Sequence, residues 1–150
     1  MPTIDLITLS DYATSECDIS DLPSIFREKI KIHLIDEDMV HLCVVTRHLD
    51  RFQFQIVTSK RVVLVHGELH KKEIKPSSGG GLGTKDRSLL LRDFTGLRHY
   101  EENMINTTNE YYLEVCGTTR EIQFRFANKE SLTKFAGLLL NVANNARKNV

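Results

Sequence analysis

The sequence contains no tryptophan and only three cysteines and three prolines among its 150 residues. The cysteines, Cys17, Cys43 and Cys116, are odd in number, widely spaced and without a CxxC pair. A disulfide framework normally uses an even number of cysteines in a small secreted domain. We therefore expect reduced thiols in a cytoplasmic protein. Cys43 stands between apolar residues, where a thiol is usually buried and inert rather than nucleophilic.

An excess of charge of either sign is also absent. Lys plus Arg and Asp plus Glu both number 20, so the formal net charge is zero. Proteins that bind nucleic acid usually carry a clear basic excess that neutralises phosphates, so no nucleic-acid partner is expected. A chain without net charge has little self-repulsion, which permits association between copies.

Long hydrophobic runs are missing as well. No apolar segment approaches the roughly 20 residues that a membrane-spanning helix needs. Residues 1–10 include Asp5 and lack the basic and then apolar order of a secretory signal. Any contact with a membrane is therefore expected to be peripheral.

The motifs of common catalytic sites do not occur. There is no GxSxG, no P-loop lysine motif and no paired-glycine dinucleotide fingerprint. The run Gly79–Gly83, followed by Lys85, is superficially similar to a phosphate loop, but the GK[ST] order and a following helix pattern are lacking. We interpret residues 76–87 as a flexible Gly-rich loop within the domain, and we predict a protein that is not an enzyme and has no cofactor.

The first regular element that the sequence predicts is a short helix over residues 22–34. Apolar residues recur there at steps of three to four: Leu22, Ile25, Phe26, Ile30 and Leu34. Ser20 or Asp21 can cap this helix, and Pro23 suits its first turn. A strand is the alternative for part of this segment, because Ile30, Ile32 and Leu34 also alternate. Residues 1–21 show no sustained period and are expected to form a flexible or edge arm.

From residue 39 the hydrophobic period changes to two, which predicts antiparallel strands joined by short turns. Seven strands are expected, at residues 40–44, 52–57, 61–65, 70–75, 88–100, 111–115 and 122–126. The third is apolar on both faces. The fourth is rich in lysine, as an edge strand often is.

A long amphipathic helix is predicted after the last strand, with Asn128 as its cap. Its apolar stripe consists of Leu132, Phe135, Leu139, Val142 and Ala146. Gly137 lies within the helix, and close packing on the sheet is the expected reason for it. This order of elements predicts a mainly β, α+β domain: a bent antiparallel seven-stranded sheet or partial barrel, capped by the C-terminal helix and preceded by a short N-terminal helix.

Three segments carry a resemblance to a known superfold: Val-Thr-Ser-Lys-Arg-Val-Val-Leu at 57–64, Arg-Asp-Phe-Thr-Gly-Leu at 92–97, and the helix at 129–148. Their order resembles the pleckstrin-homology (PH)-like superfold, most closely bacterial PH and GRAM-like domains, over residues 22–148. The resemblance implies a single domain at 22–150 with a binding function. The long Gly-rich loop and the absence of tryptophan differ from eukaryotic signalling PH domains.

Basic residues at two predicted turns form a candidate anion site: Arg47, His48, Arg51, Lys60 and Arg61. In lipid-binding PH domains the first strand-strand loop holds inositol phosphates, so the resemblance implies a phosphoinositide-like head group near residues 47–51. Arg and Lys at a rigid strand end hold phosphate oxygens through charge-assisted hydrogen bonds. The alternative is a set of solvated turn charges, and we expect the two turns to face opposite ends of the sheet.

Two further sets of residues are candidates for a metal site and for a protein contact. His66, Glu68 and His70 alternate along one strand, and two imidazoles with a carboxylate can bind zinc. Surface histidines on an edge are the favoured alternative, so no metal is expected. Leu138 and Leu140 flank the apolar stripe of the last helix, where they either contact a partner or fill the mouth of the barrel.

The predicted function is therefore that of a non-catalytic binding module. PH-like sheets expose an edge and a groove beside the closing helix, and both suit protein docking. We expect protein–protein contact, with another protein or as a homo-oligomer. Peripheral binding of an anionic lipid head group through the basic turns is the alternative.

Overall fold

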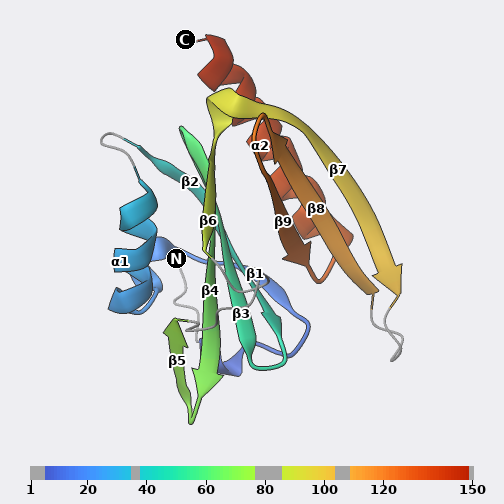
Figure 1. The fold of residues 1–150 in the computed structure, drawn as a ribbon. Coiled ribbons are helices and arrows are strands. Elements are labelled where there is room, and N and C mark those ends of the chain that lie inside the picture. The colour runs from blue at the N-terminus through green and yellow to red at the C-terminus, as the bar shows by residue number, and fades with distance from the viewer. Residues whose placement is uncertain (1–5, 35–37, 77–85, 104–108, 149–150) are drawn as a thin grey trace.

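Figure 1 shows the computed structural model, which describes residues 6–34, 38–76, 86–103 and 109–148. Most of the predicted Gly-rich loop at 76–87 lies outside these residues. Two antiparallel sheets face each other, and each is accompanied by one helix. The first sheet, sheet A, follows the order β1-β2-β3-β4-β5, with β6 also paired to β4, and the second, sheet B, follows the order β7-β8-β9.

The bounds of the regular elements follow the predicted hydrophobic periods closely. Sheet A contains β1 (Thr14–Glu16), β2 (Val40–His48), β3 (Arg51–Thr58), β4 (Arg61–His70), β5 (Glu73–Pro76) and β6 (Arg87–Leu90). Sheet B contains β7 (Phe94–Asn103), β8 (Asn109–Gly117) and β9 (Glu121–Phe126), and the two helices are α1 (Ser24–His33) and α2 (Lys129–Lys148). No helix in the described part of the chain is both long and apolar enough to cross a membrane.

The mainly β, α+β class is confirmed, but the prediction of one seven-stranded sheet is wrong, because the described residues form nine strands in two sheets. One additional strand is β1, which lies in the segment predicted as an arm and pairs with β2. The other arises because the predicted strand at 88–100 is divided by a 3-10 turn at Leu91–Asp93. Before this turn β6 pairs with β4, and after it β7 pairs with β8, so the chain changes sheets there.

Short turns set the register within sheet A. His48 pairs with Arg51 across the turn between β2 and β3, where Leu49 has a φ of 59°. The predicted edge strand at 70–75 is present with shifted limits: β4 continues to His70, and β5 begins at Glu73. Lys71 and Lys72 therefore lie in the turn, with φ values of 47° and 75°. Two successive positive φ angles are typical of a tight hairpin turn.

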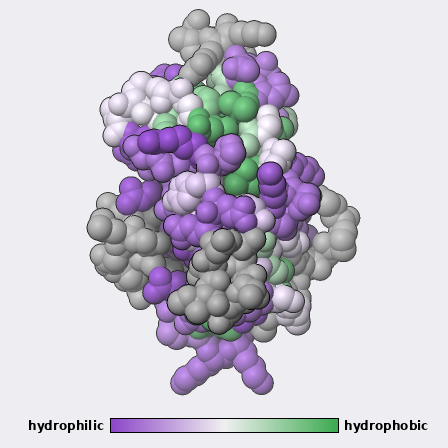
Figure 2. All heavy atoms as spheres, turned by 90° about the vertical axis from the view of Figure 1, so that its right-hand side faces the viewer, coloured by the Kyte–Doolittle hydropathy of each residue, from purple (hydrophilic) through white to green (hydrophobic). Residues whose placement is uncertain are grey.

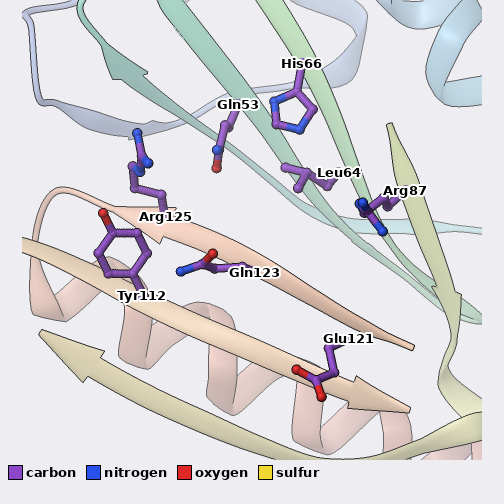
Figure 3. Close-up of a pocket in the computed structure, with 8 residues that line it drawn as sticks. All are labelled: Gln53, Leu64, His66, Arg87, Tyr112, Glu121, Gln123 and Arg125. Atoms are coloured by element: carbon purple, nitrogen blue, oxygen red, sulfur yellow. The ribbon is translucent and has the colours of Figure 1, made fainter. Parts of the chain in front are cut away.

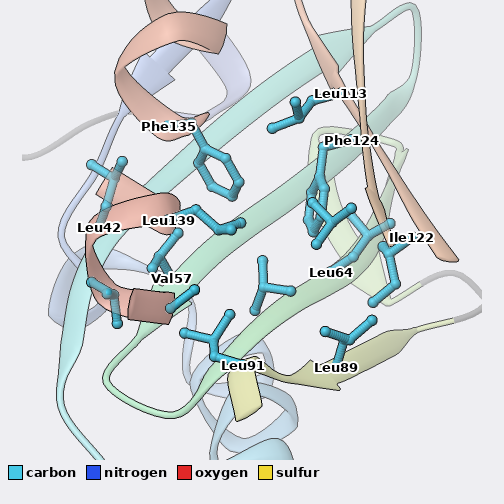
Figure 4. Packing of buried hydrophobic residues seen from close by; sticks show 14 of the residues in the cluster. Leu42, Val57, Leu64, Leu89, Leu91, Leu113, Ile122, Phe124, Phe135 and Leu139 are labelled. Carbon is cyan, nitrogen blue, oxygen red and sulfur yellow. The ribbon is translucent and has the colours of Figure 1, made fainter. Parts of the chain in front are cut away.

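Sheet A is buried on both faces, which explains why β4 is apolar on both sides. One face packs with sheet B and α2 around the buried residues drawn in Figure 4, including Leu42, Val57, Leu64, Leu113, Phe124, Phe135 and Leu139. The opposite face packs with α1 around Phe26, Ile30, Val45, Phe52, Phe54, Ile56, Val63 and Val65. Alternating residues of one strand therefore belong to different cores.

Helix α1 is confirmed, with a buried face smaller than predicted. Phe26 and Ile30 are fully buried, whereas Ile25, expected on the same face, is 50% exposed. The ring of Phe26 lies 4.6 Å from that of Phe54 on sheet A. The absence of a side chain at Gly67 allows this contact, since a β-carbon there would lie 2.9 Å from Cζ of Phe26.

The predicted cap of α1 is wrong. Pro23 occupies the N-cap position and makes no side-chain hydrogen bond there. Ser20 and Asp21 lie instead in a preceding 3-10 turn, Ile19–Asp21, and Asp18 caps that turn by accepting from the backbone N–H of Ser20. The polar residues that were predicted to cap α1 therefore lie within a separate 3-10 turn that precedes the helix.

Helix α2 is confirmed together with its cap. The backbone N–H of Ser131 donates to Oδ1 of Asn128 over 2.8 Å. Phe135 is fully buried, and its ring lies 5.2 Å from that of Phe124 and 5.3 Å from that of Phe126. The helix is thereby anchored on β9 of sheet B.

Candidate functional site

The outer edge of sheet B is open. Strand β7 stands at one end of the order β7-β8-β9, and within the described residues it pairs only with β8. In Figure 1 it forms the right-hand edge of the molecule. An unpaired edge presents a row of backbone N–H and C=O groups that can pair with another strand.

The charged residues on β7 are divided by sign. Arg98 and His99 precede Tyr100, and Glu101 and Glu102 follow it. All five residues are exposed. Lysines on an edge strand discourage pairing, whereas β7 carries a basic half and an acidic half.

Contacts across sheet B order the side chains of this edge. The rings of Tyr100 and Tyr112 are stacked, with centroids 5.1 Å apart and planes 17° from parallel. The Arg98 guanidinium lies 2.8 Å from a carboxylate oxygen of Glu114 and 3.4 Å from one of Glu121. A hydrogen bond with Glu121 raises the pKa of Glu114, and the charge of Arg98 opposes this shift. Side chains on the polar face of β7 are therefore held by partners on β8 and β9.

A mainly apolar groove of about 550 Å³ lies beside the same edge, between sheet B and α2. Tyr100, Leu132, Ala136, Gly137 and Leu140 contribute to its lining. Figure 2 views the side on which β7 forms the edge, and hydrophobic surface gathers in the upper half of that face. The expected close packing at Gly137 is wrong, because a β-carbon there would meet no atom within 4 Å. The glycine instead leaves the groove open.

The two leucines predicted as protein contacts lie in different surroundings. Leu140 is 42% exposed and lines the groove beside β7. Leu138 is partly buried, packs against the core and lines a separate groove near the C-terminal half of α2. Of these two leucines, the structure therefore places Leu140, and not Leu138, beside the open edge of sheet B.

A polar cleft lies between the two sheets. Its volume is about 300 Å³, and Figure 3 shows side chains of both sheets pointing into it: Gln53, Leu64, His66, Arg87, Tyr112, Glu121, Gln123 and Arg125. In the described part of the chain, the guanidinium of Arg87 has neither a hydrogen bond nor an ion pair. The cleft thus offers several donors to a polar or anionic group.

His66 lies deep in this cleft and is only 6% exposed. Burial lowers the pKa of its imidazole, and the positive charges of Arg125 and Arg87 lower it further, while Asp86 opposes the shift. Oδ1 of Asp86 accepts from the backbone N–H of His66 over 2.9 Å. The imidazole is therefore neutral at pH 7, and can donate one hydrogen bond and accept another.

Beside the cleft, buried and half-buried polar side chains link the two sheets in what we call the inter-sheet polar cluster: Thr14, Thr46, His48, Gln55, Glu110, Tyr112 and Arg125. The backbone N–H of Arg125 donates to Oε1 of Gln55 over 2.8 Å, and the Thr46 hydroxyl donates to the Arg125 carbonyl over 2.7 Å. Because Thr46 has only one proton, its hydroxyl must accept from Thr14, 2.9 Å away. The backbone of β9 is therefore fixed to sheet A by side chains rather than by strand pairing.

Glu110 is the charged centre of this cluster and is 3% exposed. Its Oε1 lies 2.7 Å from Nδ1 of His48, and its Oε2 lies 3.7 Å from Nε of Arg125. The Tyr112 hydroxyl donates to the same carboxylate. Burial, followed by this hydrogen bond, raises the pKa of Tyr112 to about 12, so the hydroxyl keeps its proton.

Two of the three basic residues predicted at the first turn, Arg47 and His48, are engaged within the protein. Arg47 donates to the backbone carbonyls of Leu9, over 2.6 Å, and Leu49, over 2.8 Å. His48 belongs to the inter-sheet polar cluster, and Arg51 is exposed. Arg47 therefore fastens the N-terminal segment to the turn.

Lys60 and Arg61 lie at the turn between β3 and β4. Two further basic residues, Arg92 and Arg120, lie close to this turn in the folded protein, and the sequence alone did not predict this. Lys60 lines a groove of about 660 Å³ with Arg92, His41 and apolar residues of α2. Arg61 lines a neighbouring cavity of about 220 Å³ together with Arg120. Four cationic side chains thus line two adjoining hollows, which share Leu90 in their walls.

The residues weighed as a metal site are separated. Nε2 of His70 lies 3.8 Å from a carboxylate oxygen of Glu68 near the end of β4, whereas His66 lies in the polar cleft. Among residues 6–34, 38–76, 86–103 and 109–148, no group of three or more His, Cys, Asp or Glu side chains has an arrangement that can hold a metal ion.

Sequence reasoning missed the inter-sheet polar cluster. Thr46, Gln55 and Glu110 are all nearly inaccessible to solvent, yet polar residues in an alternating strand are normally assigned to the solvent face. One signal in the sequence could have indicated this cluster. Gln55 lies between Phe54 and Ile56 in a strand whose neighbour, β4, is apolar on both faces. Such a sheet has no solvent face, so polar residues within it must pair with one another.

The comparisons with known proteins support the fold. No known family model matches the sequence, and no curated protein sequence matches it. Among solved structures, the fold is similar to that of a DUF1696 family protein with a pleckstrin-homology domain from Shewanella loihica, with a TM-score of 0.50. The two sequences are 11% identical, and the superposition covers 87% of this chain and 97% of the other. The predicted PH-like fold is confirmed, and at this identity the likeness extends to the fold alone.

Proposed function

We propose that this PH-like chain is a non-catalytic protein-contact module that assembles with a second copy of itself through the edge of β7. The observation that carries the proposal is the division of charge on this exposed strand, whose outer edge is unpaired within the described residues. A PH-like fold is compatible with many functions, so the argument rests on the residues of the edge itself.

Antiparallel pairing of two β7 strands brings opposite charges together. With Tyr100 opposite its counterpart, each Arg98 faces Glu102 of the other copy, and each His99 faces Glu101. Opposite charges directly across a strand pair stabilise it, and like charges destabilise it. The same patch occurs on both copies, as a two-fold interface requires.

The groove beside β7 supplies apolar surface to the same interface. Leu140 and Tyr100 are 42% and 40% exposed in the isolated chain. Strand addition supplies backbone hydrogen bonds, and side-chain pockets beside the edge add specificity. The zero net charge of the chain leaves little long-range repulsion between copies.

A charge-complementation experiment tests this assembly. The acidic variant Arg98→Glu/His99→Glu and the basic variant Glu101→Arg/Glu102→Arg each place like charges opposite one another in a homodimer. We expect sedimentation velocity to give a concentration-dependent mass above 17.2 kDa for the native protein. Each variant alone is expected to remain a monomer, and an equimolar mixture is expected to restore the dimer.

The matched control is Glu28→Arg/Glu73→Arg, which makes the same change in net charge as the basic variant at exposed sites on α1 and β5. It is expected to associate like the native protein. A native protein that stays monomeric at high concentration would contradict the proposal. So would a mixture of the acidic and basic variants that shows no association.

Peripheral binding of anionic lipid is the second candidate function, and the groove at Lys60 favours it. This groove combines the cations Lys60 and Arg92 with apolar side chains that include Leu138 and Val142. Basic side chains near a membrane surface attract anionic lipids. The end of the sheets that carries Lys60 is therefore a better candidate than Arg47, whose guanidinium is bonded to backbone carbonyls.

Vesicle co-sedimentation tests the lipid candidate. With vesicles of phosphatidylcholine and phosphatidylserine, we expect the variant Lys60→Glu/Arg92→Glu to lose about thirtyfold in binding, based on roughly 1 kcal/mol for each of the two basic residues near the surface. The matched control, Lys71→Glu/Lys72→Glu, changes exposed lysines in the turn between β4 and β5 and should bind like the native protein. Equal binding by both variants, or binding that does not depend on phosphatidylserine, would remove this candidate.

A further inference from the structure

Two thiols face each other where the N-terminal segment meets the edge of sheet A. Sγ of Cys17 lies 3.2 Å from Sγ of Cys43. Strand β1 pairs with β2 in the register Glu16↔Val44, and the next step of that register places Cys17 opposite Cys43. The backbone N–H of Cys17 donates to the Cys43 carbonyl over 2.9 Å, which fixes the two residues in this position.

This placement meets the geometric requirement of a disulfide. Residues directly opposite in an antiparallel pair have Cα atoms about 4.5 to 5.5 Å apart. Disulfides join Cα atoms about 4.4 to 6.8 Å apart. The sulfur atoms need to approach by only about 1 Å to reach the bonded distance. The register of β1 and β2 can therefore be kept when the bond forms.

We propose that Cys17 and Cys43 form a reversible disulfide by exchange with a small-molecule disulfide such as oxidised glutathione. The Cys17 thiolate attacks one sulfur of the oxidant, the S–S bond of the oxidant breaks, and one glutathione leaves as a thiolate. The Cys43 thiolate then attacks Sγ of Cys17 and displaces the second glutathione. The two cysteines lose two protons and two electrons, and the oxidant gains them as two glutathione thiols.

The two cysteines differ in solvent exposure, and this difference determines which thiol reacts first. Cys17 is partly exposed, whereas Cys43 is only 3% exposed. The hydrogen bond with Cys17, and then burial, raise the pKa of the Cys43 thiol. The accessible thiol therefore reacts first, and the buried thiol completes the bond from within the protein.

The bond would fasten a segment that already bridges several elements. Thr14 accepts from the backbone N–H of Ala127 over 2.8 Å, and Glu16 lies 2.7 Å from Nζ of Lys134 on α2. The two cysteines are 26 positions apart and enclose α1. Closing a loop of this length raises the melting temperature of a protein of this size by roughly 10 °C.

To test this proposal, the 150-residue protein is treated with oxidised glutathione or with dithiothreitol, and its intact mass, peptide map and thermal unfolding are recorded. We expect the oxidised protein to lose two hydrogens, to give a peptide crosslinked through Cys17 and Cys43, and to melt at the higher temperature. Dithiothreitol is expected to reverse all three changes. Cys116→Ser is the matched control, because this residue lies on β8, and it should behave like the native protein.

Two variants separate the steps. Cys17→Ser, at the partly exposed position, is expected to form neither the crosslink nor the more stable species. Cys43→Ser is expected to stop at a single glutathione adduct on Cys17. Persistent glutathione adducts on the native protein, crosslinks that involve Cys116, or disulfides only between chains would overturn the proposal.

Discussion

Replacing Phe135 with alanine is expected to lower the free energy of unfolding by about 4 kcal/mol, because it opens a cavity where α2 meets sheet B. The Phe135 side chain is fully buried, and its ring contacts those of Phe124 and Phe126. We expect the melting temperature to fall by roughly 12 °C in calorimetry at low protein concentration.

Leu140→Ala provides the matched control for this change. It shortens an apolar side chain on the same helix, but at a site that is 42% exposed. The expected loss is under about 1 kcal/mol, since an exposed truncation leaves no cavity. Similar losses for the two variants would show that α2 does not close the core between the sheets.

Replacing Glu110 with alanine is expected to cost about 3 to 5 kcal/mol, the usual effect of removing one partner from a buried charge cluster. The substitution leaves the half-buried side chains of Arg125 and His48 without their carboxylate. It also leaves the Tyr112 hydroxyl, which keeps its proton because its pKa is raised to about 12, without an acceptor. Chemical denaturation at pH 7 measures the loss.

Two further variants isolate the role of burial in this result. Glu110→Gln retains an oxygen that can accept from Tyr112, so its loss should be smaller than that of Glu110→Ala. Glu28→Ala removes a carboxylate that is 73% exposed and lies 4.0 Å from Lys31, and the expected change is about 0.5 kcal/mol or less. An effect of Glu110→Ala no larger than that of Glu28→Ala would contradict the assigned role of the inter-sheet polar cluster.

The two predictions concern opposite ends of one interface. At one end, apolar side chains of sheet A, sheet B and α2 form a common core. At the other end, Gln55 and Thr46 bond to the backbone of β9, and His48 contacts Glu110. Sheet B is thereby held through β9 and α2, while β7 on its far side remains open. An interface built on β7 consequently requires no rearrangement of the core.

Much of the fold could be predicted because its signals are local. The alternation in β9 and the stripe around Phe135 each determine one element, and Asn128 marks the start of α2 through a hydrogen bond only three residues away. Turn positions were likewise accessible, because residues that tolerate sharp bends interrupt the hydrophobic period. The grouping of these strands into two sheets was not accessible, since it depends on the pairing of β6 with β4 and of β7 with β8.

The candidate sites were less predictable than the fold. Arg47 and Arg51 were expected to act together, but the structure gives Arg47 two backbone carbonyl partners and leaves Arg51 exposed. Lys60 was expected at a strand turn, yet Arg92, its neighbour in the groove, comes from a distant part of the sequence. The partner of a charged side chain in a turn depends on which distant segments the fold places beside it, so the sequence pattern alone does not predict that partner.

The sequence by itself determined the kinds of elements, their order and the closing role of α2, because hydrophobic period and capping act over a few neighbouring residues. Only the tertiary structure decided that sheet A is covered on both faces, that Glu110 is buried among partners, that Cys17 meets Cys43, and that β7 keeps an open edge. Each of these features joins residues that are far apart along the chain. Their positions follow from sheet pairing and packing, which no local pattern encodes.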